Sequence, residues 1–496
     1  MIIHSLWPRP LLSQVGERSQ IMKNQQRKKQ RVVESDNQDY ISQLHFSILS
    51  NILSSLKVKE AVKTSVLSSQ WKHVYANPSN LVLDEENMLK IDYSATNDFK
   101  MNRTRAFVRN VKQYLSNVEE VRKIEELKVR FTFLNSEGYS DVDDWIRFAI
   151  KRNVEVIDLC LGEENHLSAS NDGYVFPCDI VGNEGACASS FKSLKCLRLA
   201  HCVLAPHKHC NSGFSTLKTL ELLKVDLKSM MHIKILLSSC NNLEWLGISE
   251  CYNMECLKIV HHKLKYLSLN LCRQLKALVL HSTSLETLEY KGNKIELVFD
   301  APRLKTFYSL VSDSIACHRE VWPVFRLSID LPQLETLMLE CSCNMGEVMA
   351  RRLPTFPRLR NLEIIKVAIK RQDLWWVAKT LKACPILERL ELHLKTYSCS
   401  DEEIRKESWP PRCPHNFLKE VTITGIRGHS SEIEIAIYLL RNAISLERMT
   451  IDPRTKHYLG KGKWDLSETG GNWSIRENVL KHLKQEASSA VKLQIK

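Results

Sequence analysis

The sequence lacks the patterns that mark membrane and secreted proteins. No segment of its 496 residues approaches the roughly eighteen consecutive apolar residues of a membrane span. The apolar start, Met1 to Leu12, is interrupted by His4, Arg9 and two prolines and shows no small-residue cleavage site, so we expect no secretory signal. The 16 cysteines form no Cys-x-x-Cys pair. Scattered cysteines favour free thiols in a reducing compartment, which predicts the nucleus or the cytoplasm.

Catalytic motifs are also missing. Gly460-Lys-Gly-Lys463 lacks the spacing of a phosphate-binding loop, and no Gly-x-Ser-x-Gly turn occurs. His207, His209 and Cys210 could supply metal ligands, but structural zinc sites use tighter paired spacings. A Cys–His nucleophile pair stays open, because nothing singles one out among 16 cysteines and 17 histidines. We therefore predict no catalytic residue, no cofactor and no metal, and a protein that is not an enzyme.

Positive charge is unevenly placed. The net charge is +13, and residues 1–35, with seven Lys or Arg against two Glu, contribute +5 of it. We expect this tail to be disordered, and its segment 25–31 is either a nuclear-import patch or a solvated run. No concentrated basic stripe follows residue 35, which argues against a nucleic-acid partner.

The dominant pattern that is present is a repeat of the form Leu-x-x-Leu-x-Leu. Strict copies start at Leu194, Leu217, Leu264, Leu334 and Leu387, and looser copies start at Leu243, Leu285, Leu304, Leu359, Leu418 and Leu446. The steps between starts run from 19 to 31 residues, the range of a leucine-rich repeat. Such a unit cannot bury its apolar edge alone, so the copies must stack into a solenoid.

The repeat also has a helical half. Leu374, Val377, Ala378 and Leu381 keep helical spacing, and Pro385 ends that helix before the next strand. Earlier elements fit the same scheme: a helix over 102–118, strands over 124–129 and 154–159, and a helix that carries Trp145. We predict an α/β leucine-rich-repeat solenoid, or horseshoe, with strands on the inner wall. The alternative, a doubly wound sheet, would show continuous apolar runs instead of this repeated phrase.

A small helical module precedes the repeats. Ile48, Ile52 and Leu56 give one apolar face, and Leu67 and Trp71 continue another at helical spacing. The segments 39–44, 48–56 and 59–68 with Trp71 resemble a plant F-box, which in that family binds the Skp adaptor of a cullin–RING ubiquitin ligase. The resemblance extends further. Residues 142–159 resemble the first repeats of plant F-box/leucine-rich-repeat proteins, and 417–428, 438–443 and 487–493 resemble the FBD segment that ends many of them.

The resemblance implies an adaptor-binding set in the module: Leu44, His45, Ile48, Leu49, Ile52, Leu53, Leu56, Val62, Val66, Leu67 and Trp71. The family usually has proline at the positions of His45 and Lys57, and a basic pair at Ser69 and Gln70. Proline fixes the backbone at a helix start, so these changes leave the docking edge less ordered, whereas the apolar residues remain. A module that only caps the solenoid is the alternative.

The position between the second and third leucine of each repeat predicts a concave face, because alternate residues of a strand point to opposite sides. This position holds Arg198, Glu221, Gly247, Ser268, Glu289, Met338, Glu363, Glu391, Thr422 and Thr450. We assign target binding to Arg198, Glu221, Ser268, Glu289, Met338, Glu363, Glu391 and Thr422. Four of the ten are acidic, which favours a basic or mixed partner over nucleic acid. Solvated residues without a selected sign are the alternative.

The resulting organisation is a basic tail at 1–35, an F-box-like module at 36–85, the solenoid at 86–400 and an FBD-like segment at 401–496 that continues and caps the repeats. The resemblance implies the substrate-recognition subunit of an SCF-type ubiquitin ligase, with a Skp-type adaptor, a cullin reached through it and an unidentified target protein as partners. Two alternatives stay open: an interaction scaffold with a degenerate F-box, and a nuclear nucleic-acid binder.

Overall fold

The structure is a computed structural model of the chain. It describes residues 40–41, 43–45, 48–49, 52–53, 56, 60, 63–64, 71, 79–89, 97–118, 123–132, 134–162, 173–179, 193–206, 214–293, 295–311, 331–341, 355–366, 373–394, 410–467 and 481–496. The chain divides into two units: Met1–Ser79 with Ser116–Val121, and Asn80–Leu115 with Arg122–Lys496.

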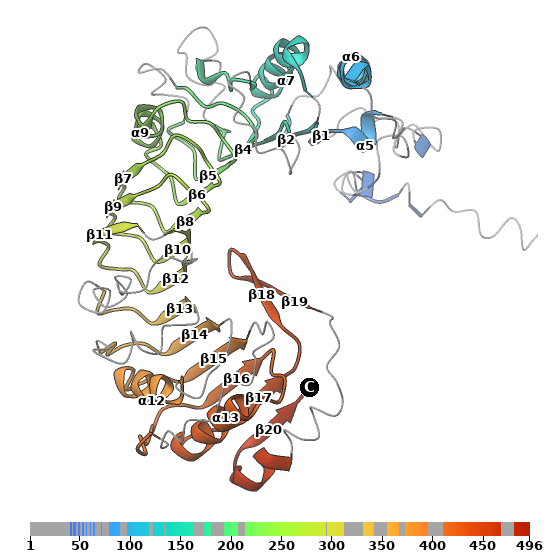
Figure 1. Ribbon diagram of the computed structural model, residues 1–496. Helices are drawn as coiled ribbons and strands as arrows, with labels where there is room; N and C mark the ends of the chain where they lie inside the picture. The colour runs from blue at the N-terminus through green and yellow to red at the C-terminus, as the bar shows by residue number, and fades with distance from the viewer. Residues whose placement is uncertain are drawn as a thin grey trace, which may run out of the picture. The chain divides into compact units, whose positions relative to one another are not determined.

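The second unit is built on one parallel sheet of fifteen strands, drawn from β1 to β20 along a curved wall in Figure 1. Neighbours in the sheet follow chain order, so every repeat adds one strand to the edge left by the repeat before it. The strands are β1 Asn80–Asp84, β2 Glu126–Arg130, β3 Val156–Cys160, β4 Cys196–Ala200, β5 Thr219–Leu223, β6 Trp245–Ser249, β8 Tyr266–Asn270, β10 Thr287–Gly292, β12 Thr306–Val311, β13 Thr336–Cys341, β14 Asn361–Lys366, β15 Arg389–Leu394, β16 Glu420–Thr424, β17 Arg448–Asp452 and β20 Lys492–Ile495. The predicted solenoid is confirmed, and β1 places its start ahead of the boundary predicted at residues 85 and 86.

The core is a ladder of leucines in register. Leu220, Leu246, Leu267 and Leu288 are paired strand to strand and are all fully buried. Burying one leucine side chain contributes about 1.5–3 kcal/mol. Each residue can reach this burial only because the repeats on both sides cover it, which is why the repeat must stack.

The turn that follows four neighbouring strands is also repeated. The residues that directly follow β4, β5, β6 and β8 all have a left-handed backbone, with φ between 51° and 56°: His201, Lys224, Glu250 and Leu271. Cysteine follows three of them. The thiols of Cys251 and Cys272 donate to strand carbonyls of the preceding repeat at 3.6 Å. Burial raises the pKa of other thiols, such as Cys240 and Cys384, to about 12. The free thiols predicted from the sequence are confirmed for the ten cysteines whose surroundings are described.

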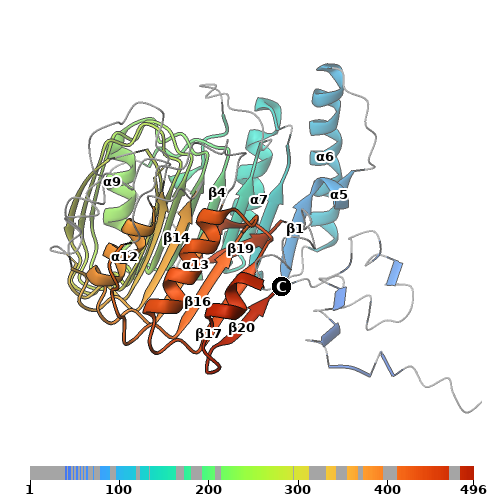
Figure 2. The ribbon, with the colours of Figure 1, turned by 60° about the horizontal axis from the view of Figure 1, so that its bottom comes forward.

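The outer layer changes along the chain. Helices cover the long sheet in several repeats: α7 Tyr139–Ile150, α9 Met230–Ser239, α12 Asp373–Ala383 and α13 Ser430–Asn442, of which α9, α12 and α13 lie on one side of it in Figure 2. The N-terminal part adds α5 Glu85–Met88, α6 Asn97–Asn117 and the short 3-10 helix η1 Ser136–Gly138. The helices predicted around Trp145 and Leu381 and over 102–118 are confirmed.

The middle repeats carry strands in place of outer helices. There β7 Cys256–Val260, β9 Ala277–His281 and β11 Glu296–Asp300 form a second parallel sheet. The Leu-x-x-Leu-x-Leu repeat does not predict this sheet. These repeats form outer strands because they are short: the steps from Leu243 to Leu264, Leu285 and Leu304 are only 21, 21 and 19 residues. A strand rises more than twice as far per residue as a helix, so a short outer strand closes a repeat that has no room for a helix.

Candidate interaction surface

The long sheet presents one continuous row of side chains on the face opposite the helices. Strand pairing links the central residue of each strand to the next. The row reads Lys128, Asp158, Arg198, Glu221, Gly247, Ser268, Glu289, Tyr308, Met338, Glu363, Glu391, Thr422 and Thr450. All ten positions predicted for the concave face therefore lie in a single row, and target binding by them stays a prediction. Tyr308 was missed, because Phe307 and Ser309 stand where that repeat should have leucines.

A hairpin from the C-terminal part lies against this row. Its strands are β18 Lys456–Gly460 and β19 Lys463–Leu466, which Figure 1 shows on the inner side of the curved sheet. Lys461 and Gly462 form the two-residue turn, with φ of 55° and 70°. Two successive positive φ values are typical of a type I′ turn, whose twist matches that of the two strands.

The tip of the hairpin contacts two glutamates of the row. The backbone N–H of Lys461 donates to Glu289 Oε2 at 3.0 Å, and its Nζ donates to Glu221 Oε2 at 2.8 Å. Tyr266 donates its hydroxyl to the same Glu289 oxygen at 2.6 Å. The carboxylate of Glu289 is almost fully buried, so these donors replace the water that an ionised group would otherwise keep.

Two aromatic rings extend the surface beneath the lysine. Trp245 and Tyr266 stack with ring centres 5.4 Å apart and nearly parallel planes, and Lys461 Nζ lies 4.9 Å from the Trp245 ring centre. Gly247 makes room for the indole, because a Cβ there would lie 2.5 Å from Trp245. A cation over a tryptophan face is attracted by the ring's charge distribution.

The stem of the hairpin contacts later repeats. Tyr458 packs in an apolar cluster with Leu310, Met338 and Ile365. The Trp464 ring lies 4.5 Å from the ring of His393. The hairpin therefore contacts strands of the long sheet from β5 to β15.

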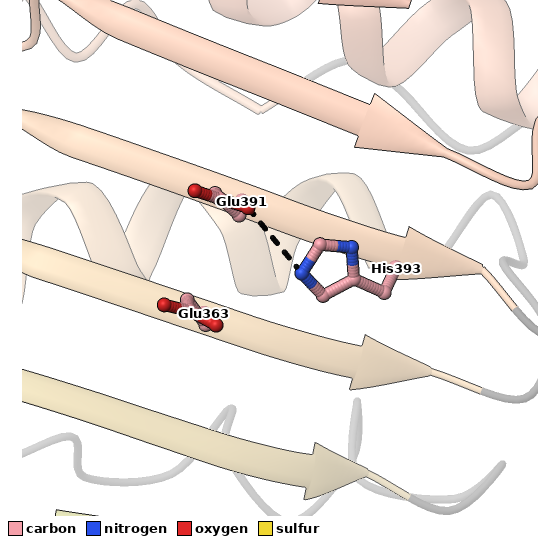
Figure 3. A group of neighbouring side chains, drawn as sticks. All are labelled: Glu363, Glu391 and His393. Carbon is pink, nitrogen blue, oxygen red and sulfur yellow. Dashed lines mark ion pairs between the residues drawn. The ribbon is translucent and has the colours of Figure 1, made fainter. Parts of the chain in front are cut away.

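Near the stem, Glu363 and Glu391 of the row form a polar cluster with His393, shown in Figure 3. Their ligand atoms all lie within 4.8 Å of one another, and Glu391 Oε2 is 3.5 Å from His393 Nε2. Burial, followed by repulsion from Glu391, raises the pKa of Glu363 to about 7, while Lys456 acts in the opposite direction. His393 Nδ1 lies 3.0 Å from the Thr424 hydroxyl.

This cluster has the side chains that could hold a divalent metal, but a cation from the hairpin already reaches it. Lys456 Nζ is 3.2 Å from Glu391 Oε2 and 4.5 Å from the Trp464 ring centre. The contacts therefore favour recognition of an ammonium group over metal binding. Repeat spacing already predicts Glu363 and Glu391 as neighbours in the row. His393 was missed, although it lies two residues after Glu391 on the same strand and therefore on the same side of the sheet.

Comparison with known proteins agrees with the repeat architecture. The family model described as the At1g61320/AtMIF1 LRR domain matches residues 117–496. Three relatives from Arabidopsis thaliana align over most of both chains. They are F-box/FBD/LRR-repeat protein At1g13570 (25% identical, covering 83% of this chain and 91% of the relative), putative F-box/LRR-repeat protein At5g54820 (24%; 83% and 89%) and F-box/FBD/LRR-repeat protein At5g56420 (24%; 84% and 92%). This chain belongs to the plant F-box/leucine-rich-repeat family.

In this F-box/leucine-rich-repeat protein the hairpin and β20 lie in the FBD-like region, so the region both ends the long sheet and covers part of its face. Ser268, Glu289 and Met338 are buried there, with exposed fractions of 5%, 3% and 1%. In the free chain these three side chains are covered, and target binding by them stays a prediction. Arg198, Glu221, Glu363, Glu391 and Thr422 are half-buried.

The F-box-like module of the first unit is described at selected residues. Leu49, Leu53 and Trp71 form its buried core, with Leu44, Ile52 and Leu56 packed against them. The first three side chains are buried in the module itself in this structure, and the docking role of the predicted set stays a prediction. The carbonyl of His45 accepts from the amides of Ile48 and Leu49, so a helical turn forms without the family's proline.

The exposed side of the module carries apolar side chains. Ile48 is 46% exposed, and Tyr40 and Ile41 are more exposed still. Tyr40 and Ile41 were missed as candidates, although both lie in the segment that resembles the F-box. Val62, Val66 and Leu67 of the predicted set lie outside the described residues, as do His207, His209 and Cys210. No helix among the described residues is long and apolar enough to cross a membrane.

Proposed function

We propose that this protein is the substrate-recognition subunit of an SCF-type cullin–RING ubiquitin ligase. The observation that carries the proposal is the combination, in one chain, of an F-box-like module with exposed apolar side chains and a repeat sheet with a long, continuous polar and aromatic face. The family membership and the names of the relatives support it.

The mechanism is tethering. The module binds a Skp-type adaptor, and through it the cullin, while the face of the long sheet holds a target protein. Holding both partners at once raises the effective concentration of the target near the ligase's ubiquitin donor. In this proposal the chain acts in the nucleus or the cytoplasm and makes no covalent bond itself.

Co-purification with a plant Skp adaptor tests the proposal. The double variant Ile41→Asp/Ile48→Asp changes exposed side chains of the module, so the module should stay folded while a hydrophobic interface is lost. Ile444→Asp is the matched control, because Ile444 is also exposed and lies among the C-terminal repeats. We expect adaptor binding by the intact chain and by Ile444→Asp, and at least about tenfold less by the double variant.

A non-ligase interaction scaffold is the second candidate. It is favoured by His45 and Lys57 at positions where the family usually has proline. Failure of the intact chain to retain the adaptor would refute the ligase proposal and leave the scaffold, because target binding by the sheet does not depend on the module.

A further inference from the structure

We infer that the acidic row of the long sheet binds a target segment that carries lysine and aromatic residues, and that the β18–β19 hairpin occupies this surface in the free protein. The acidic row is Glu221, Glu289, Glu363 and Glu391. The inference deepens the proposed function, on which it rests, because it names the chemistry of the target and a displacement that must accompany its capture.

Charge complementarity is the first argument. The ammonium groups of two hairpin lysines both end on this row: Lys461 Nζ at Glu221 and Lys456 Nζ at Glu391. Glu289 accepts from the backbone N–H of Lys461. The carboxylates are half-buried or buried, so they interact with a cation more strongly than exposed carboxylates do. Glu289 and Glu363 are already buried in the free protein, so burying their carboxyl groups costs free energy even when no target is bound. A surface that keeps acidic groups in such places is suited to a basic ligand.

The aromatic contacts are the second argument. Tyr458 is seated among Leu310, Met338 and Ile365, and Trp464 lies against His393. A lysine ammonium group beside a tryptophan ring thus occurs at both the tip and the stem. At the tip the ring is Trp245 of the sheet, and at the stem it is Trp464 of the hairpin itself. Aromatic anchors in apolar seats, flanked by paired charges, are typical of strong binding positions in protein interfaces.

The limited attachment of the hairpin is the third argument. Among the described residues, β18 and β19 pair only with each other and not with the long sheet. An isolated two-stranded hairpin is marginally stable in water. Most side chains of the β18–β19 hairpin are exposed. Among its described contacts, one backbone hydrogen bond reaches the row, from the N–H of Lys461 to Glu289. A target segment with the same chemistry can therefore compete for the surface. Its apparent affinity is its intrinsic affinity multiplied by the fraction of molecules in which the hairpin has left the surface.

Binding of a hairpin-like peptide tests the inference on the full chain. The probe is a cyclised fluorescent peptide with the sequence of residues 456–466, and the control peptide has glutamate in place of the residues that correspond to Lys456 and Lys461. Fluorescence anisotropy gives the affinity for the wild type and for Lys456→Glu/Lys461→Glu, which releases the hairpin. Lys463→Glu is the matched control variant, because Lys463 is an exposed lysine of the same hairpin.

We expect the double variant to bind the probe about five- to thirtyfold more tightly than the wild type, the effect of losing two partly exposed ion pairs that hold a competitor. Lys463→Glu should bind like the wild type, and the control peptide should bind to none of them. Adding Glu221→Lys/Glu391→Lys to the double variant reverses both charge pairs. This fourfold variant should reseat its own hairpin and lose the probe.

Hydrogen exchange of residues 456–466 reports the hairpin directly. It should be faster in the double variant than in the wild type, and slow again in the fourfold variant, with exchange over β12–β15 unchanged as the check on folding. Equal probe affinity in the wild type and the double variant, no binding to either, or unchanged hairpin exchange would each overturn the inference. Adaptor binding without probe binding would refute the inference alone, whereas probe binding without adaptor binding would refute the proposed function alone.

Discussion

Replacing Glu363 with glutamine should stabilise the protein in alkaline solution and leave it almost unchanged in acid. Glu363 is held at a pKa of about 7, because burial and the neighbouring Glu391 disfavour its charged form. The ordinary pKa of a glutamate is about 4.3. Between these two values the folded protein keeps a proton that the unfolded chain releases. The free energy of unfolding therefore falls as the pH rises through this window.

The size of the effect follows from the width of the window. A gap of about 2.7 pH units corresponds to about 3.7 kcal/mol at most. Glu363 keeps some contact with solvent and lies near Lys456, so we expect about 1–3 kcal/mol. Glutamine resembles the protonated acid and carries no such cost. The difference between Glu363→Gln and the wild type should be near zero at pH 4.5 and should reach its full value at pH 8.

Guanidinium unfolding of both proteins at pH 4.5, 6 and 8 measures this difference, and other titrating groups cancel in the comparison. Glu255→Gln is the control, because Glu255 is an exposed glutamate that pairs with Lys276, the residue just before outer strand β9. Its effect should stay within about 0.5 kcal/mol at every pH. A Glu363→Gln variant whose stability difference does not change with pH, or which is less stable than the wild type at pH 8, would refute the reasoning.

Three further predictions concern backbone, core and thiols. Gly425→Ala should lower the free energy of unfolding by about 3 kcal/mol or more, because φ is +76° and a Cβ would lie 2.1 Å from the carbonyl oxygen of Leu394. Gly462→Ala should lower it by only about 1–2 kcal/mol, because φ is +70° there but no atom lies within 4 Å of the Cβ. Both costs are read as shifts in the unfolding midpoint, and equal shifts would contradict the steric argument. Leu288→Ala in the fully buried ladder should cost about 2–5 kcal/mol, whereas an unchanged midpoint would mean that the ladder does not carry the core. Among the ten cysteines with described surroundings, exposed Cys256 should be alkylated first by iodoacetamide. Mass spectrometry of the modified protein gives the order of alkylation, and a buried cysteine that reacts before Cys256 would contradict the prediction.

Much of the fold can be predicted from the sequence, because a leucine-rich repeat is a local pattern. Each Leu-x-x-Leu-x-Leu motif specifies its own strand, the side of the strand that is buried and the residue that points to the opposite side. This is why ten positions chosen by spacing alone lie in one row of the sheet. The prediction missed Tyr308, where the local phrase breaks down, and the outer strands of the middle repeats, where repeat length decides the structure.

The contact between the β18–β19 hairpin and the row could not be predicted in this way. Gly460-Lys-Gly-Lys463 lacks the spacing of a phosphate-binding loop, and its role as a hairpin tip depends on partners 172 and 240 residues earlier in the chain. Local periodicity carries no information about such pairs. The same holds for Leu49 and Trp71, whose spacing indicates an apolar face but not whether the module itself covers it.

The sequence separation between Lys461 and Glu221 also fixes an order in time. Repeats can fold as soon as their neighbours exist, since each one contacts mainly the next, whereas this ion pair closes a loop of 240 residues. On a ribosome the β5 strand is finished long before the hairpin is made. The face of the long sheet is therefore open during synthesis and is covered only at the end, so nascent chains should be more accessible to lysine-rich partners than finished ones.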